Sequence, residues 1–312
     1  MVYLLALIAA LSNALTSVFQ RMGVETAPAD ATLKLRLVTH ALRRGVWILG
    51  FAFMIVSFVA QASALHLGRL SQVQPVLTTE LLFLVLILAV WFRFRVGVRE
   101  WAGVLAAAGG LAGFLLFASP TGGERLPGGA DWATVGALSG VVIVAGVVLA
   151  RRGSRWWRAA MFGTSSAVGF AFTAALTKTV TRYLGGDWSD VFRHWQTYGL
   201  VGSGLLSVFL AQNAFHAGPI AASQSTLVLV DPLASILIGI GLFGDNLTTS
   251  GYHGPLEALS LLVLFVGAFW LSHSPLVSGM KGDDSGFHEM LSLRSRSRRL
   301  GGNVAHTPAP RS

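Results

Sequence analysis

Two carboxylates are the residues of this 312-residue chain best suited to chemistry: Glu80 and Asp231 each lie near the middle of a long apolar stretch. A charged side chain at membrane depth costs free energy and is rarely retained without a use. At such a depth a carboxylate can take up and release a proton or a small cation. We therefore expect Asp231, together with Glu80, to bind a coupling ion or part of a substrate.

Asp231 belongs to a polar stripe on an otherwise apolar helix. On a helical wheel Gln224, Asp231 and Ser235 fall on one face. Pro232 follows directly and has no N–H, so a backbone carbonyl beside the carboxylate loses its helical partner. The stripe predicts the wall of a polar cavity, and the alternative is a structural hydrogen bond to a neighbouring helix.

Glu80 has two interpretations. Gln74 and Thr78 share one face of its helix with Ser71, and an ideal helix would place Glu80 almost opposite. A bend at Pro75 would rotate the later turns towards that face. Glu80 then lines the path, or it forms a structural tie to a basic residue (Arg69, Lys178 or His216).

Two stripes of small polar residues are expected to line the same path. They comprise Ser12, Asn13, Thr16 and Gln20 in the first span, and Ser166, Thr173 and Thr177 in the sixth. Such stripes line cavities, but they also permit close helix packing. Their presence in two matching spans favours a shared path.

A second group of polar residues lies nearer the ends of the spans: Gln61, His66, Gln212, Asn213 and His216. Histidine titrates near neutral pH, although a histidine at a membrane interface is more often simply solvated. Lys178 lies close to one end of the sixth span. Its ammonium would reach the interface or balance a carboxylate inside the membrane.

No catalytic signature accompanies these residues. The sequence has no Gly-rich phosphate loop followed by Lys, no His-Glu-x-x-His and no nucleophile triad, which argues against an ATP-driven pump or a membrane protease. It has no cysteine, which excludes disulfides and thiolate metal sites. We expect neither an enzyme nor a cofactor, and the sequence does not identify a metal.

The composition predicts an all-α protein that spans a membrane several times. Hydrophobic residues make up 53% of the chain and charged residues 12%, about half the proportion of charged residues in soluble proteins. Nine apolar runs are close to the roughly 20 residues that cross a hydrocarbon core. The predicted spans are 2–22, 46–66, 70–92, 99–118, 131–150, 159–183, 197–217, 220–243 and 256–273. The first span has no basic residue before it, which favours a spanning helix over a cleaved signal.

The distribution of basic residues predicts the orientation. Most Lys and Arg fall on one side of the nine spans, and only Arg69, Arg125, Arg182 and Arg193 fall on the other. The positive-inside rule places the basic side in the cytoplasm, so the N-terminus is expected outside and the C-terminus inside the cell (inner) membrane. The net charge of +9 therefore indicates membrane orientation and not nucleic-acid binding.

Two stretches of the chain resemble each other. The sequence Phe58-Val59-Ala60-Gln61, with His66, Gly68 and Gln74, recurs as Phe209-Leu210-Ala211-Gln212, with His216, Gly218 and Gln224. Each copy runs on into a helix with a central acidic residue. We expect a four-helix repeat over 1–119, a linker span over 131–150 and a second four-helix repeat over 159–273. The offset of five helices is odd, so the two repeats would be inserted in opposite directions.

Two polar segments lie outside these spans. Residues 23–45 predict either a short amphipathic helix on the cytoplasmic face or a plain loop. Residues 274–312 are rich in Ser and Arg and predict a disordered basic cytoplasmic tail.

The doubled four-helix unit resembles the drug/metabolite transporter superfamily, including its EamA-like permeases. The stretch Leu67-Gly68-Arg69-Leu70-Ser71-Gln72-Val73-Gln74-Pro75-Val76-Leu77 is similar to the turn and proline-containing helix of that superfamily, and with the nine spans it also resembles NIPA-type magnesium transporters. The resemblance covers about 2–273. The small multidrug exporters of the superfamily couple transport through a glutamate in their first helix, where this chain has Asn13.

These observations predict a secondary carrier of a small metabolite or cation that works by alternating access and is coupled to protons or cations. The alternatives are a Mg²⁺ transporter or channel, since carboxylate and amide oxygens suit that ion, and a non-transporting scaffold subunit. The expected partners are a small molecule or ion, the lipid bilayer and, as an option, a second copy of the chain.

Overall fold

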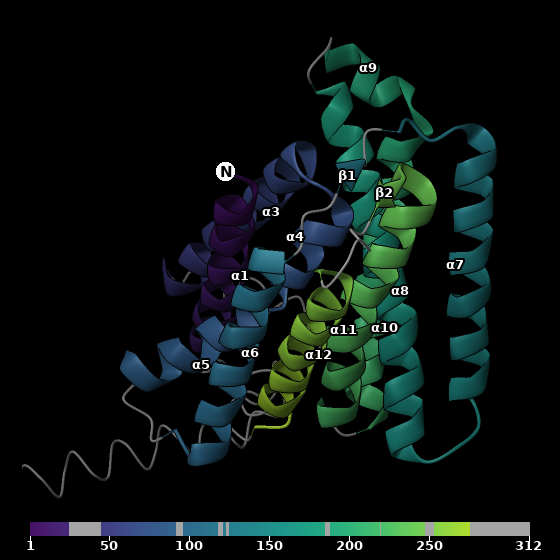
Figure 1. Ribbon diagram of the computed structural model, residues 1–312. Coiled ribbons are helices and arrows are strands. Elements are labelled where there is room, and N and C mark those ends of the chain that lie inside the picture. The colour runs from purple at the N-terminus through teal and green to yellow at the C-terminus, as the bar shows by residue number, and fades with distance from the viewer. Residues whose placement is uncertain are drawn as a thin grey trace, which may run out of the picture.

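The protein is a bundle of long helices, seen here in a computed structural model (Figure 1). The structure describes residues 1–24, 45–91, 96–117, 121–122, 125–184, 188–218, 220–246 and 253–274. The predictions for 23–45 and for the basic tail therefore fall almost entirely outside the described residues. Within them, nine helical segments are long and apolar enough to cross a membrane, which agrees with the predicted multi-pass membrane protein.

The helices follow the predicted spans closely. In the first part of the chain they are α1 (Val2–Val24), α3 (Gly45–Leu67), α4 (Leu70–Leu77), α5 (Glu80–Val90) and α6 (Val98–Phe117). They continue as α7 (Gly129–Ala150), α8 (Arg155–Tyr183), α9 (Trp188–Arg193), α10 (Trp195–Ala217), α11 (Ile220–Ile238), the π-helical turn η2 (Gly239–Phe243) and α12 (His253–Ser272). Two short strands, β1 (Thr121–Gly122) and β2 (Asp245–Asn246), pair in antiparallel register and join the segment after α6 to the segment after η2.

The third span differs from the continuous helix predicted over 70–92. Pro75 lies inside α4, and the helix ends at Leu77 before α5 begins at Glu80. Proline has no N–H to continue the ladder, and the hydroxyls of Thr78 and Thr79 donate to the carbonyls of Pro75 and Val76, both at 2.7 Å. The third span is therefore interrupted by a two-residue turn at Thr78 and Thr79, where both residues keep right-handed helical dihedral angles.

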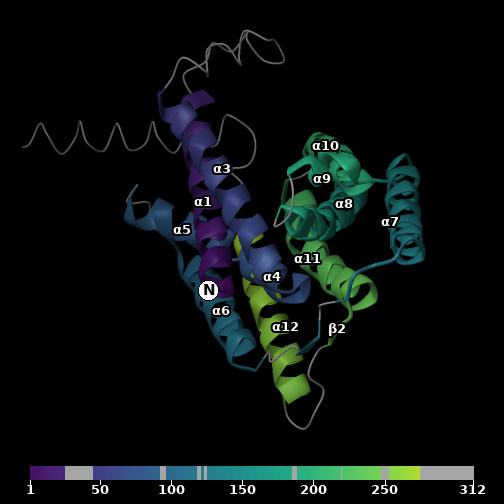
Figure 2. The same ribbon diagram turned by 90° about the horizontal axis from the view of Figure 1, so that it is seen from above.

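Each long helix packs mainly against one or two neighbouring helices. α1 lies along α3, α8 lies along α10 and α11, and α6 lies along α12. Seen from above, α1, α3 and α5 are on one side, α8, α9 and α10 are on the other, and α11 and α12 lie between them (Figure 2). α7 stands at the edge of the bundle, mainly against α8 (Figure 1).

Glycine brings α6 and α12 unusually close together. A Cβ added at Gly110 would lie 2.6 Å from the Cα of Leu264 and 2.8 Å from the carbonyl oxygen of Ser260. A Cβ at Gly267 would lie 2.8 Å from the carbonyl oxygen of Gly103. Small residues at such crossings allow backbones to approach, which is the usual basis of helix association in lipid.

This close packing predicts opposite effects at two adjacent glycines. Gly110→Ala is expected to lower the free energy of unfolding by about 1–3 kcal/mol, because the new methyl group meets backbone atoms that cannot move aside. Gly109→Ala is the matched control: a Cβ there has nothing within 4 Å, and alanine is the better helix former. Unfolding in mixed micelles measures both, and equal midpoints would contradict the close approach of α6 and α12.

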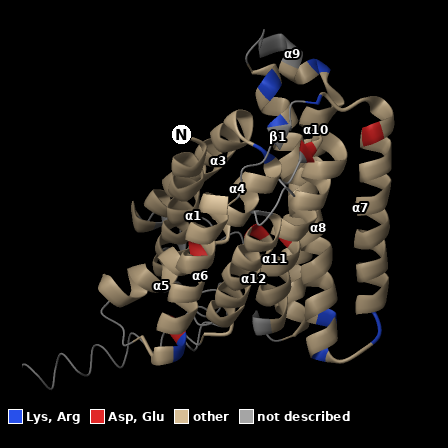
Figure 3. Cartoon of the chain, in the orientation of Figure 1, with Lys and Arg blue, Asp and Glu red and all other residues tan. Residues whose placement is uncertain are grey.

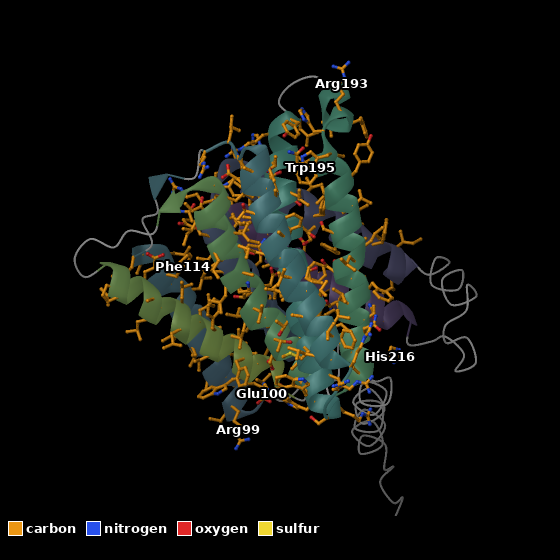
Figure 4. All side chains as sticks on the ribbon, turned by 90° about the vertical axis from the view of Figure 1, so that its right-hand side faces the viewer. Arg99, Glu100, Phe114, Arg193, Trp195 and His216 are labelled. Carbon is orange, nitrogen blue, oxygen red and sulfur yellow. The ribbon has the colours of Figure 1, made fainter. Side chains whose placement is uncertain are left out.

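Charged residues are distributed unevenly along the bundle (Figure 3). Lys and Arg gather towards the ends of the helices, whereas acidic residues also occur at mid-height, near α6 and α11. Arg99 and Arg193 lie at opposite ends of the molecule (Figure 4), as expected of residues assigned to opposite sides of a membrane.

Candidate functional site

A cavity of about 630 Å³ lies between helices of the bundle. Its walls come from α1, α3, α4 and α5 in the first half of the chain and from α8, α10 and α11 in the second half. The volume lies within the range of roughly 300–1,000 Å³ that is typical of pockets for small organic ligands. The two halves of the chain therefore share one ligand-sized chamber.

Most of the site residues predicted from the sequence line this cavity. Those in the lining are Asn13, Gln61, Gln74, Glu80, Thr173, Thr177, Gln212, Gln224 and Asp231. Thr16, Ser235, Lys178 and His216 are not among the lining residues. Reasoning from the sequence did not select three phenylalanines that also line the cavity: Phe58, Phe170 and Phe215.

Asp231 reaches the cavity from α11 at the point where Pro232 interrupts the ladder of hydrogen bonds. Since proline has no N–H, the carbonyl of Val228, another lining residue, lacks its usual partner four residues on. Ser235 is fully buried behind the carboxylate, and its Oγ donates to Asp231 Oδ1 at 3.4 Å. Ser235 therefore supports Asp231 and does not face the ligand space itself.

Glu80 lines the same cavity, directly after the turn at Thr78 and Thr79. It is the first residue of α5, where the positive end of the helix dipole favours a negative charge. Asn13 Nδ2 donates to Glu80 Oε2 from α1, and Glu80 lies close enough to Asp231 for the two carboxyl groups to interact electrostatically. Glu80 and Gln74, which an ideal helix would place on different faces, therefore line one cavity.

Gln74 and Gln224 occupy matching places in the two repeated stretches, and both face the cavity. Each side chain is only 4% exposed. Neither amide forms a hydrogen bond to another residue in the described part of the chain. A buried amide without a partner is costly, so these two groups are free to bind a ligand.

The threonine hydroxyls of the lining are already engaged as donors. Thr173 Oγ1 donates to the carbonyl of Gly169 at 2.7 Å, and Thr177 Oγ1 donates to the carbonyl of Thr173 at 2.9 Å. Thr78 does the same towards Pro75. Each hydroxyl carries one proton, so these oxygens remain available to the cavity only as acceptors.

Lys178 has a role outside the cavity. Its Nζ lies 3.9 Å from Asp245 Oδ1, and the two side chains are 2% and 0% exposed. The other oxygen of Asp245 accepts from the N–H of Ser71 at 3.1 Å and from its hydroxyl at 2.8 Å, while Nζ lies 4.6 Å from the ring centre of Phe243. Lys178 therefore balances a buried carboxylate, as one interpretation expected, but that carboxylate is Asp245 and lies away from the cavity.

Thr16 and His216 fit the interpretations in which a small polar residue serves helix packing and a histidine near a helix end is simply solvated. Thr16 is buried, and its Oγ1 donates to the carbonyl of Ser12 within the same helix at 2.9 Å. His216 is an exposed residue near the end of α10 (Figure 4). In the described ranges no group of three or more His, Cys, Asp or Glu side chains is placed to hold a metal ion.

The chain is similar to an uncharacterised protein of Corynebacterium glutamicum. The two sequences are 27% identical over 288 residues, which cover 89% of this chain and 98% of that protein. No family model matches the chain. No solved structure matches it either.

Proposed function

We propose that the protein is a secondary carrier of the drug/metabolite type that moves a small metabolite or cation across the inner membrane by alternating access. The observation that supports this proposal most is the cavity of about 630 Å³ between the two halves of the chain, with Asp231 and Glu80 in its walls. Such a volume suits an organic molecule better than a bare metal ion. A carboxylate inside the membrane suits a proton or cation that is exchanged during the cycle.

Two four-helix repeats of opposite orientation, with α7 as the linker, are part of the proposal. Equivalent helices make equivalent pairs, since α1 packs along α3 and α8 packs along α10. The turn glycines also match. A Cβ at Gly68 would lie 3.2 Å from Val2 Cγ2, and one at Gly218 would lie 2.6 Å from the backbone carbonyl carbon of Arg155. In both cases the turn after the second helix of the repeat touches the start of the first helix.

Alternating access can be tested with single cysteines, because the chain has none of its own. In oriented membrane vesicles, Gln74→Cys is expected to react with a water-soluble maleimide added on either side. Acidifying one side should change the two labelling rates in opposite directions, because a carrier that opens to one side closes to the other.

A lipid-facing position provides the matched control. Val141 lies on α7 and is 65% exposed on the outside of the bundle, so Val141→Cys should not react from either side. If the two rates at Gln74→Cys rise or fall together, the protein is a channel. Labelling from one side only, at every pH, would favour a scaffold subunit.

A further inference from the structure

We propose that the cavity selects a protonated primary amine and recognises it through its N–H groups. This inference names the substrate class of the carrier proposed above and rests on that function. It is drawn from the hydrogen-bonding capacity, the charge and the apolar surface of the cavity lining.

The first observation is that the threonine hydroxyls of the lining already use their protons elsewhere. The hydroxyls of Thr78, Thr173 and Thr177 donate to backbone carbonyls of their own segments, and Asn13 donates its amide N–H to Glu80. The Asp231 carboxylate and the Val228 carbonyl have no proton to give. Among the described lining residues, the remaining side-chain amide donors are the second N–H of Asn13 and the N–H groups of Gln61, Gln74, Gln212 and Gln224. The amides can donate as well as accept, so the groups that need donors from a ligand are those that can only accept: the two carboxylates and the Val228 carbonyl.

The second observation is charge. The described lining contains the carboxylates of Asp231 and Glu80 and contains no Lys, Arg or His. Lys178 follows the lining residue Thr177 directly, but its ammonium lies beside Asp245. Inside a low-dielectric bundle such a chamber attracts cations and repels anions. An organic acid is therefore a poor fit, and an ammonium group is a good one.

The third observation separates a primary ammonium from a quaternary one. Gln74 and Gln224 are buried and equivalent in the repeat, and neither amide has a hydrogen-bond partner among the described residues. Their amide oxygens can therefore accept from N–H or O–H donors of a ligand. A primary ammonium carries three N–H groups and can bond a carboxylate and amide oxygens together. A quaternary ammonium has none and would leave these buried acceptors unsatisfied.

The rest of the ligand has an apolar surface to contact. Phe58, Phe170 and Phe215 line the cavity together with Met54 and Leu227. Aromatic faces attract cations as well as apolar groups. A short aryl or alkyl amine combines the two properties that these walls require.

The test is a series of four ligands with the same apolar part, applied to the full-length protein in detergent. The ligands are 2-phenylethylamine, 2-phenylethanol, phenylacetate and trimethyl(2-phenylethyl)ammonium. Calorimetric titration is expected to show the primary amine binding about ten- to a hundredfold more tightly than the other three, as a charged hydrogen bond implies. Asp231→Asn should remove the preference for the amine over the alcohol, and Val141→Ala on the lipid-facing side of α7 should leave it unchanged.

The outcomes separate this inference from the proposed function. Equal or tighter binding of the quaternary ion overturns recognition through N–H groups. Equal or tighter binding of the alcohol or the acid, or no binding of the amine, overturns the selection of an ammonium. If the ligand series fails while cavity labelling still alternates between the two sides, the protein is a carrier for another class of substrate.

Discussion

Replacing Lys178 with methionine is expected to lower the free energy of unfolding by about 3–5 kcal/mol. The substitution would leave Asp245 charged at a site where the carboxylate is fully buried and its Oδ1 has no hydrogen-bond partner. The Nζ of Lys178, 3.9 Å away, is the cation that balances it. Unfolding by denaturing detergent in mixed micelles measures the loss.

The double variant Lys178→Met/Asp245→Asn is the control for this prediction. Asparagine can still accept from Ser71 through its amide oxygen, while the uncompensated charge is gone. We expect the double variant to be more stable than Lys178→Met alone, because replacing a whole buried ion pair by neutral groups is often close to neutral. If the two variants have the same stability, relief of an uncompensated charge is not the reason that the two residues are paired.

Asp231→Asn is expected to abolish proton-linked transport while the protein remains folded. Asparagine keeps the size of the side chain and an acceptor for Ser235 Oγ, which lies 3.4 Å from the native carboxylate, but it cannot bind or release a proton. Proteoliposomes containing a pH-sensitive dye provide the measurement, with solutes added singly from a panel of metabolites. A solute that drives proton movement with the native protein should drive none with the variant.

Ser235→Ala is the matched control for Asp231→Asn. Ser235 contacts the carboxylate but is not part of the cavity lining, so its loss should reduce proton movement only modestly. Proton movement at the native rate in Asp231→Asn would remove Asp231 from the coupling mechanism.

The helices could be predicted from the sequence because each span is a local property of the chain. About twenty apolar residues in a row indicate a membrane helix, whatever the structure of the rest of the protein. The structure confirms nine such segments within the described residues. The inverted relation of the two repeats stays a prediction, because it depends on how whole helices are inserted.

The cavity could be predicted in part. The stripe that contains Gln224 and Asp231 predicts a cavity-facing wall because its helical periodicity is visible in the sequence, and both residues line the cavity. The place of Glu80 depended on how strongly Pro75 disturbs its helix. An uninterrupted helix and one with a turn after Pro75 have the same residues in the sequence, so periodicity could not distinguish them.

The buried pair of Lys178 and Asp245 could not have been found in this way. Asp245 follows the eighth span in a short polar segment, where a carboxylate normally indicates a solvated loop. The residue that donates two hydrogen bonds to it, Ser71, is 174 positions away in the chain. Asp245 is buried only because segments that are distant in the chain pack together. The local sequence around Asp245 does not indicate that packing.

The position of α7 at the rim has a consequence for how the protein is inserted during synthesis. Of the nine membrane segments in the described chain, α7 is the least embedded, with 17% of its apolar window buried. Each crossing reverses the direction of the polypeptide, however, so loss of this one crossing would thread α8 to α12 backwards through the bilayer. The helix that is least embedded in the bundle therefore still fixes the direction in which every later helix crosses.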